Sequence, residues 1–334
     1  MKVTYLLHSL IFHQMKRLVI LIFSIIFLPS TIFAEPFSDE KFELYKDAKN
    51  DIKKSNWYFQ ARTQSSGAPN QIGIGIFRLL HLKTNSLSFF DFQINSEFGD
   101  FDGANWSYLV DKLFDGSSIL NTEVGSFGFN TSTKVGKRWK SNQGSSIYGL
   151  NIGYETRLMK TGDADNAIVY NPTQAFFSQL SFELEARNDK WSINPYSLIP
   201  ITEEDKHLND TFIASPITTS GIDLGLNINK NWNTIIGFYF QELDLYLREE
   251  IGFKGRISYT KPKNYKFGVN ISHDNTFDTR VSADIKYLFN NAAKQKKALD
   301  NRLFKLPNNR NIRVHDCGLK NLRNSRKWMQ CKKI

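Results

Sequence analysis

The stretch SSIYGLNIGYETRL, residues 145–158, determines how the rest of this chain is interpreted. From residue 148 onward, apolar or aromatic side chains alternate with small or polar ones. One face carries Tyr148, Leu150, Ile152 and Tyr154, and the other carries Gly149, Asn151, Gly153, Glu155 and Arg157. A period of two is typical of a β-strand with one apolar and one polar face. The polar face suits a wet or crowded interior, and the tyrosines suit a membrane–water boundary.

The same alternation recurs along most of the chain and predicts twelve strands. They are expected at residues 55–63, 72–82, 86–98, within 121–138, 145–158, 174–187, 191–200, 221–229, 232–241, 250–260, 265–273 and 277–289. Most of the expected connections alternate between short turns and longer loops, as in outer-membrane barrels. Such a sheet must close, because hydrocarbon leaves no partner for a free backbone amide. A soluble sandwich or soluble barrel is the alternative, since it gives similar strands.

The predicted fold class is therefore all-β, a transmembrane antiparallel β-barrel of about twelve strands over residues 55–290. The mean hydropathy of −0.39 is that of a water-soluble protein. After the N-terminus, no apolar run approaches the ~20 residues that a membrane helix needs. A barrel hides its apolar surface by alternation, so a polar average is compatible with membrane residence.

The N-terminal residues 1–34 have the pattern of a signal peptide. Lys16 and Arg17 precede the apolar run LVILIFSIIFL, and PSTIFA ends at Ala34, where we expect cleavage. Met15 is the expected start, because the signal is well formed from there. The alternative is an uncleaved membrane anchor, for which the run is short. Residues 35–54 are polar and are expected to form a periplasmic lead-in. The predicted location is the outer membrane of a Gram-negative-type bacterium.

Polar side chains on the inner parity of these strands are expected to line the lumen. They are Asn151, Glu155, Arg157, Glu183, Glu185, Arg187, Lys254 and Arg256. Paired carboxylates can act in acid–base catalysis, but Arg187 shares a face with Glu183 and Glu185 and offsets their charge. The segment SHDNT, residues 272–276, lacks the serine two places after His273 that outer-membrane phospholipases carry. No catalytic, cofactor or metal site is predicted.

Two other functions remain open at this point. A small channel or porin also has polar inner faces, although porins usually have ~16–18 strands. An outer-membrane hydrolase is less favoured, because the chain offers no recognisable catalytic group of residues. We therefore expect a protein that is not an enzyme.

The C-terminal segment, residues 291–334, is strongly basic. It holds thirteen Lys or Arg and two Asp, a formal charge of +11 in a chain of +10. Such a tail suits anionic lipid head groups, including lipopolysaccharide, or acidic surface polymers; a solvated disordered tail is the alternative. The export signal argues against nucleic acid. An oxidising compartment favours a disulfide between Cys317 and Cys331, whereas His315 lacks the ligands for a metal site.

From about Leu79 to Phe289 the chain resembles the β-domain of the inverse autotransporters, the intimin and invasin family. The resemblance is carried by NSLSFFDFQINSEF, SIYGLNIGYETRL, AFFSQLSFELEARNDKWSINPYSLIP and GIDLGLNINKNWNTIIGFYFQ. It implies a twelve-stranded outer-membrane barrel that depends on the barrel-assembly machinery. It also implies that the barrel anchors a C-terminal passenger and takes part in its export.

The segment NRLFKLPNNRNIRV, residues 301–314, resembles the family's linker that threads back through the pore. This implies that Arg310 and Arg313 lie in the lumen, where we expect them to meet Glu155, Glu183 and Glu185. About twenty residues follow this linker. We therefore expect an anchor for its own short tail, with export of that tail as a further expected role, and without the immunoglobulin-like passenger of the adhesins.

Overall fold

The structure is a computed structural model that describes most of the expected strands and part of the tail. The described residues are 56–64, 70–83, 85–98, 128–141, 144–160, 171, 173–202, 206–208, 212–243, 248–261, 265–275, 278–289 and 301–318. All of them belong to one compact unit, Asp39–Ile334. The expected signal peptide, the lead-in and residues 319–334 lie outside the described residues.

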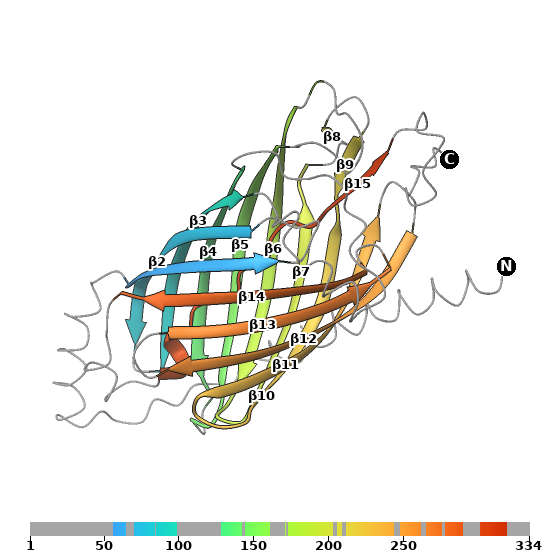
Figure 1. Ribbon diagram of the computed structural model, residues 1–334. Helices are drawn as coiled ribbons and strands as arrows, with labels where there is room; N and C mark the ends of the chain where they lie inside the picture. Colours follow the sequence, from blue (N-terminus) through green and yellow to red (C-terminus); the bar gives the residue numbers. More distant parts are fainter. Residues whose placement is uncertain are drawn as a thin grey trace. The chain divides into compact units, whose positions relative to one another are not determined.

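Twelve antiparallel strands close into one barrel (Figure 1). They are β1 (Asn56–Gln64), β2 (Asn70–Lys83), β3 (Ser86–Phe98), β4 (Gly128–Lys140), β5 (Ile147–Lys160), β6 (Gln174–Arg187), β7 (Trp191–Pro200), β10 (Thr218–Asn227), β11 (Trp232–Leu243), β12 (Arg248–Lys261), β13 (Tyr265–Asp274) and β14 (Asp278–Leu288). Each strand pairs with the barrel strands before and after it in the chain, and β1 closes the barrel against β14. The predicted fold class is confirmed.

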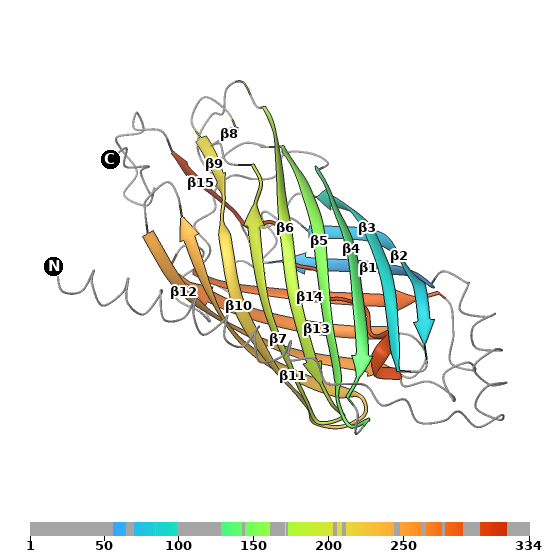
Figure 2. The same cartoon turned by 180° about the vertical axis from the view of Figure 1, so that it is seen from behind.

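A second, three-stranded sheet stands beside the barrel strands, in the order β15-β9-β8. Its strands are β8 (Lys206–His207), β9 (Phe212–Pro216) and β15 (Val314–Gly318), and η3 (Asn301–Phe304) is a short 3-10 helix. Residues 201–220, which lie between two expected strands and were expected to form a long loop, contain β8, β9 and the start of β10, so this expectation is wrong. Figure 2 shows β15 next to β9 from behind.

The barrel has two distinct ends. One end, here called the short-turn end, carries the turns at 84–85, 141–146, 188–190, 228–231 and 262–264. The other, the long-loop end, carries the long connections at 99–127, 161–173 and 201–217 and the shorter ones at 65–69, 244–247 and 275–277. Because the number of barrel strands is even, β1 begins and β14 ends at the short-turn end.

The alternation seen in the sequence becomes two faces of the barrel wall. On β5, Ile152 and Tyr154 are 44% and 43% exposed on the outside, whereas Asn151 and Glu155 are each 2% exposed on the inside. The outside is therefore apolar and the inside polar, which is the arrangement of a barrel in lipid.

Aromatic side chains flank the short turns on the outer face. Ring centroids are 6.4 Å apart for Trp139 and Tyr148, and 5.0 Å apart for Trp232 and Tyr259. Tyr265 and Tyr287 add a third pair at the same end, 4.7 Å apart. Tyr and Trp concentrate at membrane–water interfaces, so the short-turn end has the girdle that such a boundary requires. Within the described residues, no helix is long and apolar enough to cross a membrane.

Candidate functional site

The candidate site is the lumen together with residues 301–314, here called the lumenal segment. At the short-turn end, Arg302 Nη1 donates to the carbonyl oxygen of Ser145 at 2.8 Å. At the long-loop end, the backbone amide of Ile217 donates to the carbonyl oxygen of Arg313 at 3.0 Å, and β15 then pairs with β9. The segment therefore crosses the barrel from one end to the other (Figure 1).

An apolar cluster surrounds the beginning of the lumenal segment. Leu303 is fully buried, and Leu306 and Phe304 pack against the same cluster. The buried barrel residues of this cluster are Tyr58, Phe77, Leu82, Leu87, Phe89 and Ile147. Burying a leucine side chain contributes about 1.5–3 kcal/mol, so Leu303 fixes the segment at the short-turn end.

Arg138 connects the beginning of the lumenal segment to the charged residues of the barrel wall. Its Nη1 donates to the carbonyl oxygens of Leu303 at 2.9 Å and Lys305 at 2.5 Å. Its Nε and Nη2 donate to the two carboxylate oxygens of Glu185 at 2.7 and 2.9 Å. The guanidinium also lies 4.5 Å from the ring centroid of Phe89. A fully buried arginine is acceptable here because its charge and its donors are satisfied.

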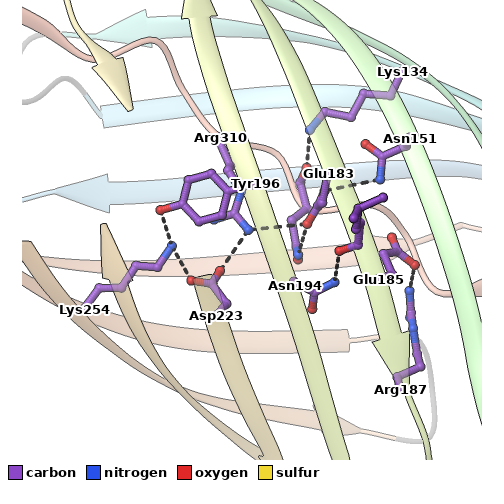
Figure 3. Close-up of polar contacts among 12 residues, drawn as sticks. Lys134, Asn151, Glu183, Glu185, Arg187, Asn194, Tyr196, Asp223, Lys254 and Arg310 are labelled. Carbon is purple, nitrogen blue, oxygen red and sulfur yellow. Dashed lines mark hydrogen bonds and ion pairs between the residues drawn. The ribbon is translucent and has the colours of Figure 1, made fainter. Parts of the chain in front are cut away.

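Arg310 occupies the middle of the lumen (Figure 3). Its Nη2 lies 2.8 Å from Asp223 Oδ2 and 3.4 Å from Glu183 Oε1. Its guanidinium stacks on Tyr196, with Cζ 3.5 Å from the ring centroid. One side chain of the segment thus joins β6, β7 and β10.

Both carboxylates that meet Arg310 have a second partner. Lys254 Nζ lies 2.7 Å from Asp223 Oδ1 and donates to the Tyr196 hydroxyl at 3.1 Å. Asn308 Nδ2, on the lumenal segment, donates to Glu183 Oε1 at 2.7 Å. The network in Figure 3 is therefore shared between the barrel wall and the segment.

Tyr196 and Tyr239 each pack against a glycine of a neighbouring strand. Their rings form cation–π contacts with Arg310 and Arg313 of the lumenal segment. A Cβ at Gly221 would lie 2.6 Å from the Tyr196 hydroxyl oxygen, and one at Gly252 would lie 2.1 Å from the Tyr239 ring. Arg313 Cζ lies 4.2 Å from the Tyr239 ring centroid. Only glycine leaves room for these rings, and each cation–π contact is worth about 0.5–2 kcal/mol.

The wall also holds the backbone of the segment. Lys134 Nζ donates to the carbonyl oxygen of Asn308. Gln179 Nε2 donates to that of Arg310 at 3.2 Å, and Arg157 Nη1 donates to that of Ile312 at 3.4 Å. Together with Arg138, these donors satisfy carbonyl groups that a buried, extended chain would otherwise leave unpaired.

The structure puts the eight residues expected in the lumen on the inner face. Asn151 donates to Glu183 at 3.3 Å, and Arg256 Nη1 lies 2.5 Å from Asp284 Oδ1. Arg187 pairs with Glu185. Arg157, Lys254, Glu155 and Glu185 take part in the contacts described above and below.

The expected partner of Arg313 is wrong. Its Nη1 lies 3.4 Å from Asp274 Oδ2, and among the described residues it forms no ion pair with Glu155, Glu183 or Glu185. Glu155 lies 3.3 Å from Lys134 Nζ, so a cation of the neighbouring strand already neutralises it, as Arg138 neutralises Glu185.

Sequence reasoning missed several members of the site. They are Lys134, Arg138, Tyr196, Asp223, Tyr239 and Asp274, together with the apolar cluster around Leu303. Lys134, Arg138 and Asp223 lie on the inner parity of expected strands, so parity alone was a usable signal for them, whereas Asp274 lies one residue beyond the expected strand 265–273. The ring positions of Tyr196 and Tyr239 depend on the glycines opposite them, Gly221 and Gly252, and these pairs are known only from the strand register.

The other residues considered in the sequence are His273, Cys317 and Cys331. His273 is exposed on the outer face, and its Nδ1 lies 3.0 Å from Thr279 Oγ1 on the adjacent strand. No group of three or more potential metal ligands occurs among the residues that the structure describes. Cys317 lies in β15, but Cys331 lies outside the described residues, so the disulfide stays a prediction.

No protein-family model and no curated protein sequence matches this chain. A chain solved in a study of the in-meso crystallization of membrane proteins is 11% identical, with a TM-score of 0.51, and covers 78% of this chain and 99% of its own length.

Two further similar structures are the KdgM porin in complex with disordered oligogalacturonate and the β-domain of the Bordetella autotransporter BrkA. The porin is 10% identical, covering 71% of this chain and 100% of its own, with a TM-score of 0.40. The autotransporter domain is 11% identical, covering 70% and 98%, with a TM-score of 0.31. At such identities a likeness concerns the fold alone. The closed barrel of this chain, with its apolar outside and polar inside, is the fold of an outer-membrane β-barrel, and this fold indicates the outer membrane as its location.

Proposed function

We propose that this protein is an outer-membrane anchor of inverse-autotransporter type. Its barrel would hold the lumenal segment and deliver the residues that follow it to the outer surface of the cell. The observation that supports this most is the path of residues 301–314, from the short-turn end to the long-loop end of the lumen.

The direction of the path follows from the fold. Outer-membrane barrels have short turns in the periplasm and longer loops outside. Strand β14 ends at the short-turn end, so the chain re-enters the barrel from the periplasmic side. Val314 then pairs with Pro216 in a connection of the long-loop end. Residues after Gly318 would therefore continue on the outside, where a basic tail can meet anionic lipid or acidic polymers.

The contacts of the segment favour an anchor over an open channel. Leu303 is buried in an apolar cluster, and Arg310 is paired with Asp223 and Glu183. A channel would require all of these contacts to break before ions could pass. The small-channel alternative therefore depends on the segment leaving the lumen.

Surface access of the C-terminus tests the proposal. An epitope added after Ile334 should bind antibody on intact cells, because the tail would emerge at the long-loop end. The matched control is the same epitope inserted at the short turn of residues 228–231, which should bind only after the outer membrane is permeabilised. Equal protection of both epitopes on intact cells would contradict the proposed path.

Conductance separates the anchor from the channel. The full-length protein should conduct poorly in planar bilayers, because the lumenal segment fills the pore. Truncation after Asn290 removes this segment and should raise the single-channel conductance. If full-length protein conducts as well as the truncated form, the segment lies outside the pore and the channel alternative replaces the anchor.

A further inference from the structure

One side of the lumen carries positive charge that the lumenal segment does not neutralise. This side is formed by the inner faces of β1, β12, β13 and β14. Around Asp284 its cationic residues are Arg62, Arg256, Lys266 and Lys286, and Lys305 of the segment adds another. The acidic side chains that act on them are mainly Asp91 and Asp284. Lys254 and Arg280 of the same strands lie near other carboxylates, Asp223 and Asp274.

Lys266 and Lys286 stand directly opposite each other. They are register partners on β13 and β14, and both occupy inward positions. Directly opposite side chains in an antiparallel pair have Cβ atoms about 5 Å apart, where like charges destabilise the sheet. Neither ammonium group forms an ion pair with a residue that the structure describes. The lysine nitrogen of Lys286 lies 5.6 Å from the Tyr58 ring centroid.

The nearest carboxylates are already engaged. Arg256 binds both oxygens of Asp284, at 2.5 and 3.0 Å, and Asn270 donates to the same carboxylate at 3.1 Å. Asp91 accepts the hydroxyl hydrogen of Tyr58, 3.1 Å from its Oδ2. Asp284 attracts both wall lysines, Asp91 attracts Lys286, and Glu183 attracts Lys305. These three acidic charges are fewer than the five cationic ones.

Lys305 brings the segment into this cluster. Its charge, together with those of Arg256 and Lys286, repels the charge of Lys266, and the charge of Asp284 opposes this repulsion. Its side chain is exposed, so its ammonium group can reach a solute in the lumen. Three lysines, two from the wall and one from the segment, therefore share one side of the lumen near the short-turn end.

We propose that Lys266, Lys286 and Lys305 form a binding site for a phosphate-type oxyanion. Each ammonium group offers three donors, and hydrogen bonds between ions are roughly twice as strong as those between neutral groups. A tetrahedral oxyanion has enough acceptors to bridge three lysines and replaces their repulsion by attraction. The ligand is a free periplasmic solute and not a lipid head group, because these residues face the lumen. The site depends on the barrel and on the position of Lys305, and not on export of the tail.

Titration of the folded full-length protein in detergent tests the site. Inorganic phosphate and pyrophosphate, added separately, should bind saturably and raise the thermal unfolding midpoint. Lys266→Gln and Lys286→Gln should each weaken phosphate affinity about tenfold, because each removes one charge-assisted hydrogen bond. Lys230→Gln, in an exposed short turn, is the matched control and should bind phosphate as the parent protein does.

A second readout distinguishes a binding site from a structural role. Without any added anion, Lys266→Gln should raise the unfolding midpoint, because it removes a like-charge contact with Lys286. The heat-modifiable band on gels shows that each variant has folded. Absence of saturable binding of both anions to the parent overturns the proposal. Unchanged affinity in Lys266→Gln and Lys286→Gln overturns it as well.

Discussion

Replacement of Arg310 by glutamine should free the lumenal segment from the middle of the barrel. Breaking a buried ion pair costs about 3–5 kcal/mol when the partner is left alone. In this variant Asp223 would still form its ion pair with Lys254, and Glu183 would still accept a hydrogen bond from Asn308, so the cost is lower. The loss of the cation–π contact with Tyr196 raises the cost. We expect a loss of about 3 kcal/mol in segment docking, which is roughly a 100-fold change in the docking equilibrium.

Thiol labelling measures that equilibrium. Asn311→Cys, in a background of Cys317→Ser and Cys331→Ser, reports how often the segment leaves the lumen. When redocking is faster than labelling, the labelling rate is proportional to the open fraction, so Arg310→Gln should label roughly 100-fold faster.

Arg302→Gln is the matched control for this experiment. Its ion-pair partner Asp189 is 86% exposed and lies 3.3 Å away, and the hydrogen bonds of Arg302 to the carbonyl oxygens of Ser145 and Gly144 are exposed as well. Exposed pairs contribute about 0–1 kcal/mol. The control should therefore change the rate less than about fivefold. Equal labelling of Arg310→Gln and its parent would refute the role given to this arginine.

Two other predictions test the faces of the wall and the apolar cluster. Ile152→Arg should destabilise the barrel by about 2–4 kcal/mol in vesicle unfolding, because Ile152 faces lipid; Asn151→Arg should cost much less, because Glu183 lies beside it. Equal costs would contradict the assigned faces. Leu303→Ala should weaken segment docking by about 2–4 kcal/mol and speed labelling at residue 311 by roughly 30-fold or more. An unchanged rate would show that the cluster does not hold the segment.

The barrel itself was accessible from the sequence, because its outer face must be apolar at every second position. The predicted bounds of β3, β6 and β7 agree with the structure, because a short turn fixes one end of each of these strands. The small sheet could not be predicted, because β8, β9 and β15 have two to five residues each. A period of two needs a longer run to be visible.

The contents of the lumen were harder to predict, for two physical reasons. Near the short-turn end, inward residues such as Phe77 and Phe89 are apolar, so both parities are hydrophobic and the inner face loses its signal. Partner choice in the lumen depends on strand register and on contacts across the barrel. Arg313 meets Asp274, 39 positions away, and nothing local in the sequence marks that pair.

The barrel wall holds the lumenal segment largely through hydrogen bonds to its backbone, and this affects which other polypeptides the lumen could accommodate. Lys134, Arg138, Arg157 and Gln179 all donate to carbonyl oxygens of that segment. A carbonyl is present on every residue, so these four donors do not read side-chain identity. A different polypeptide on the same path could accept hydrogen bonds from the same four side chains, whatever its own side chains are. In the proposed export, these donors would contact any chain that follows the path, and Leu303 and Arg310 would add the specific contacts that hold the segment in its final position.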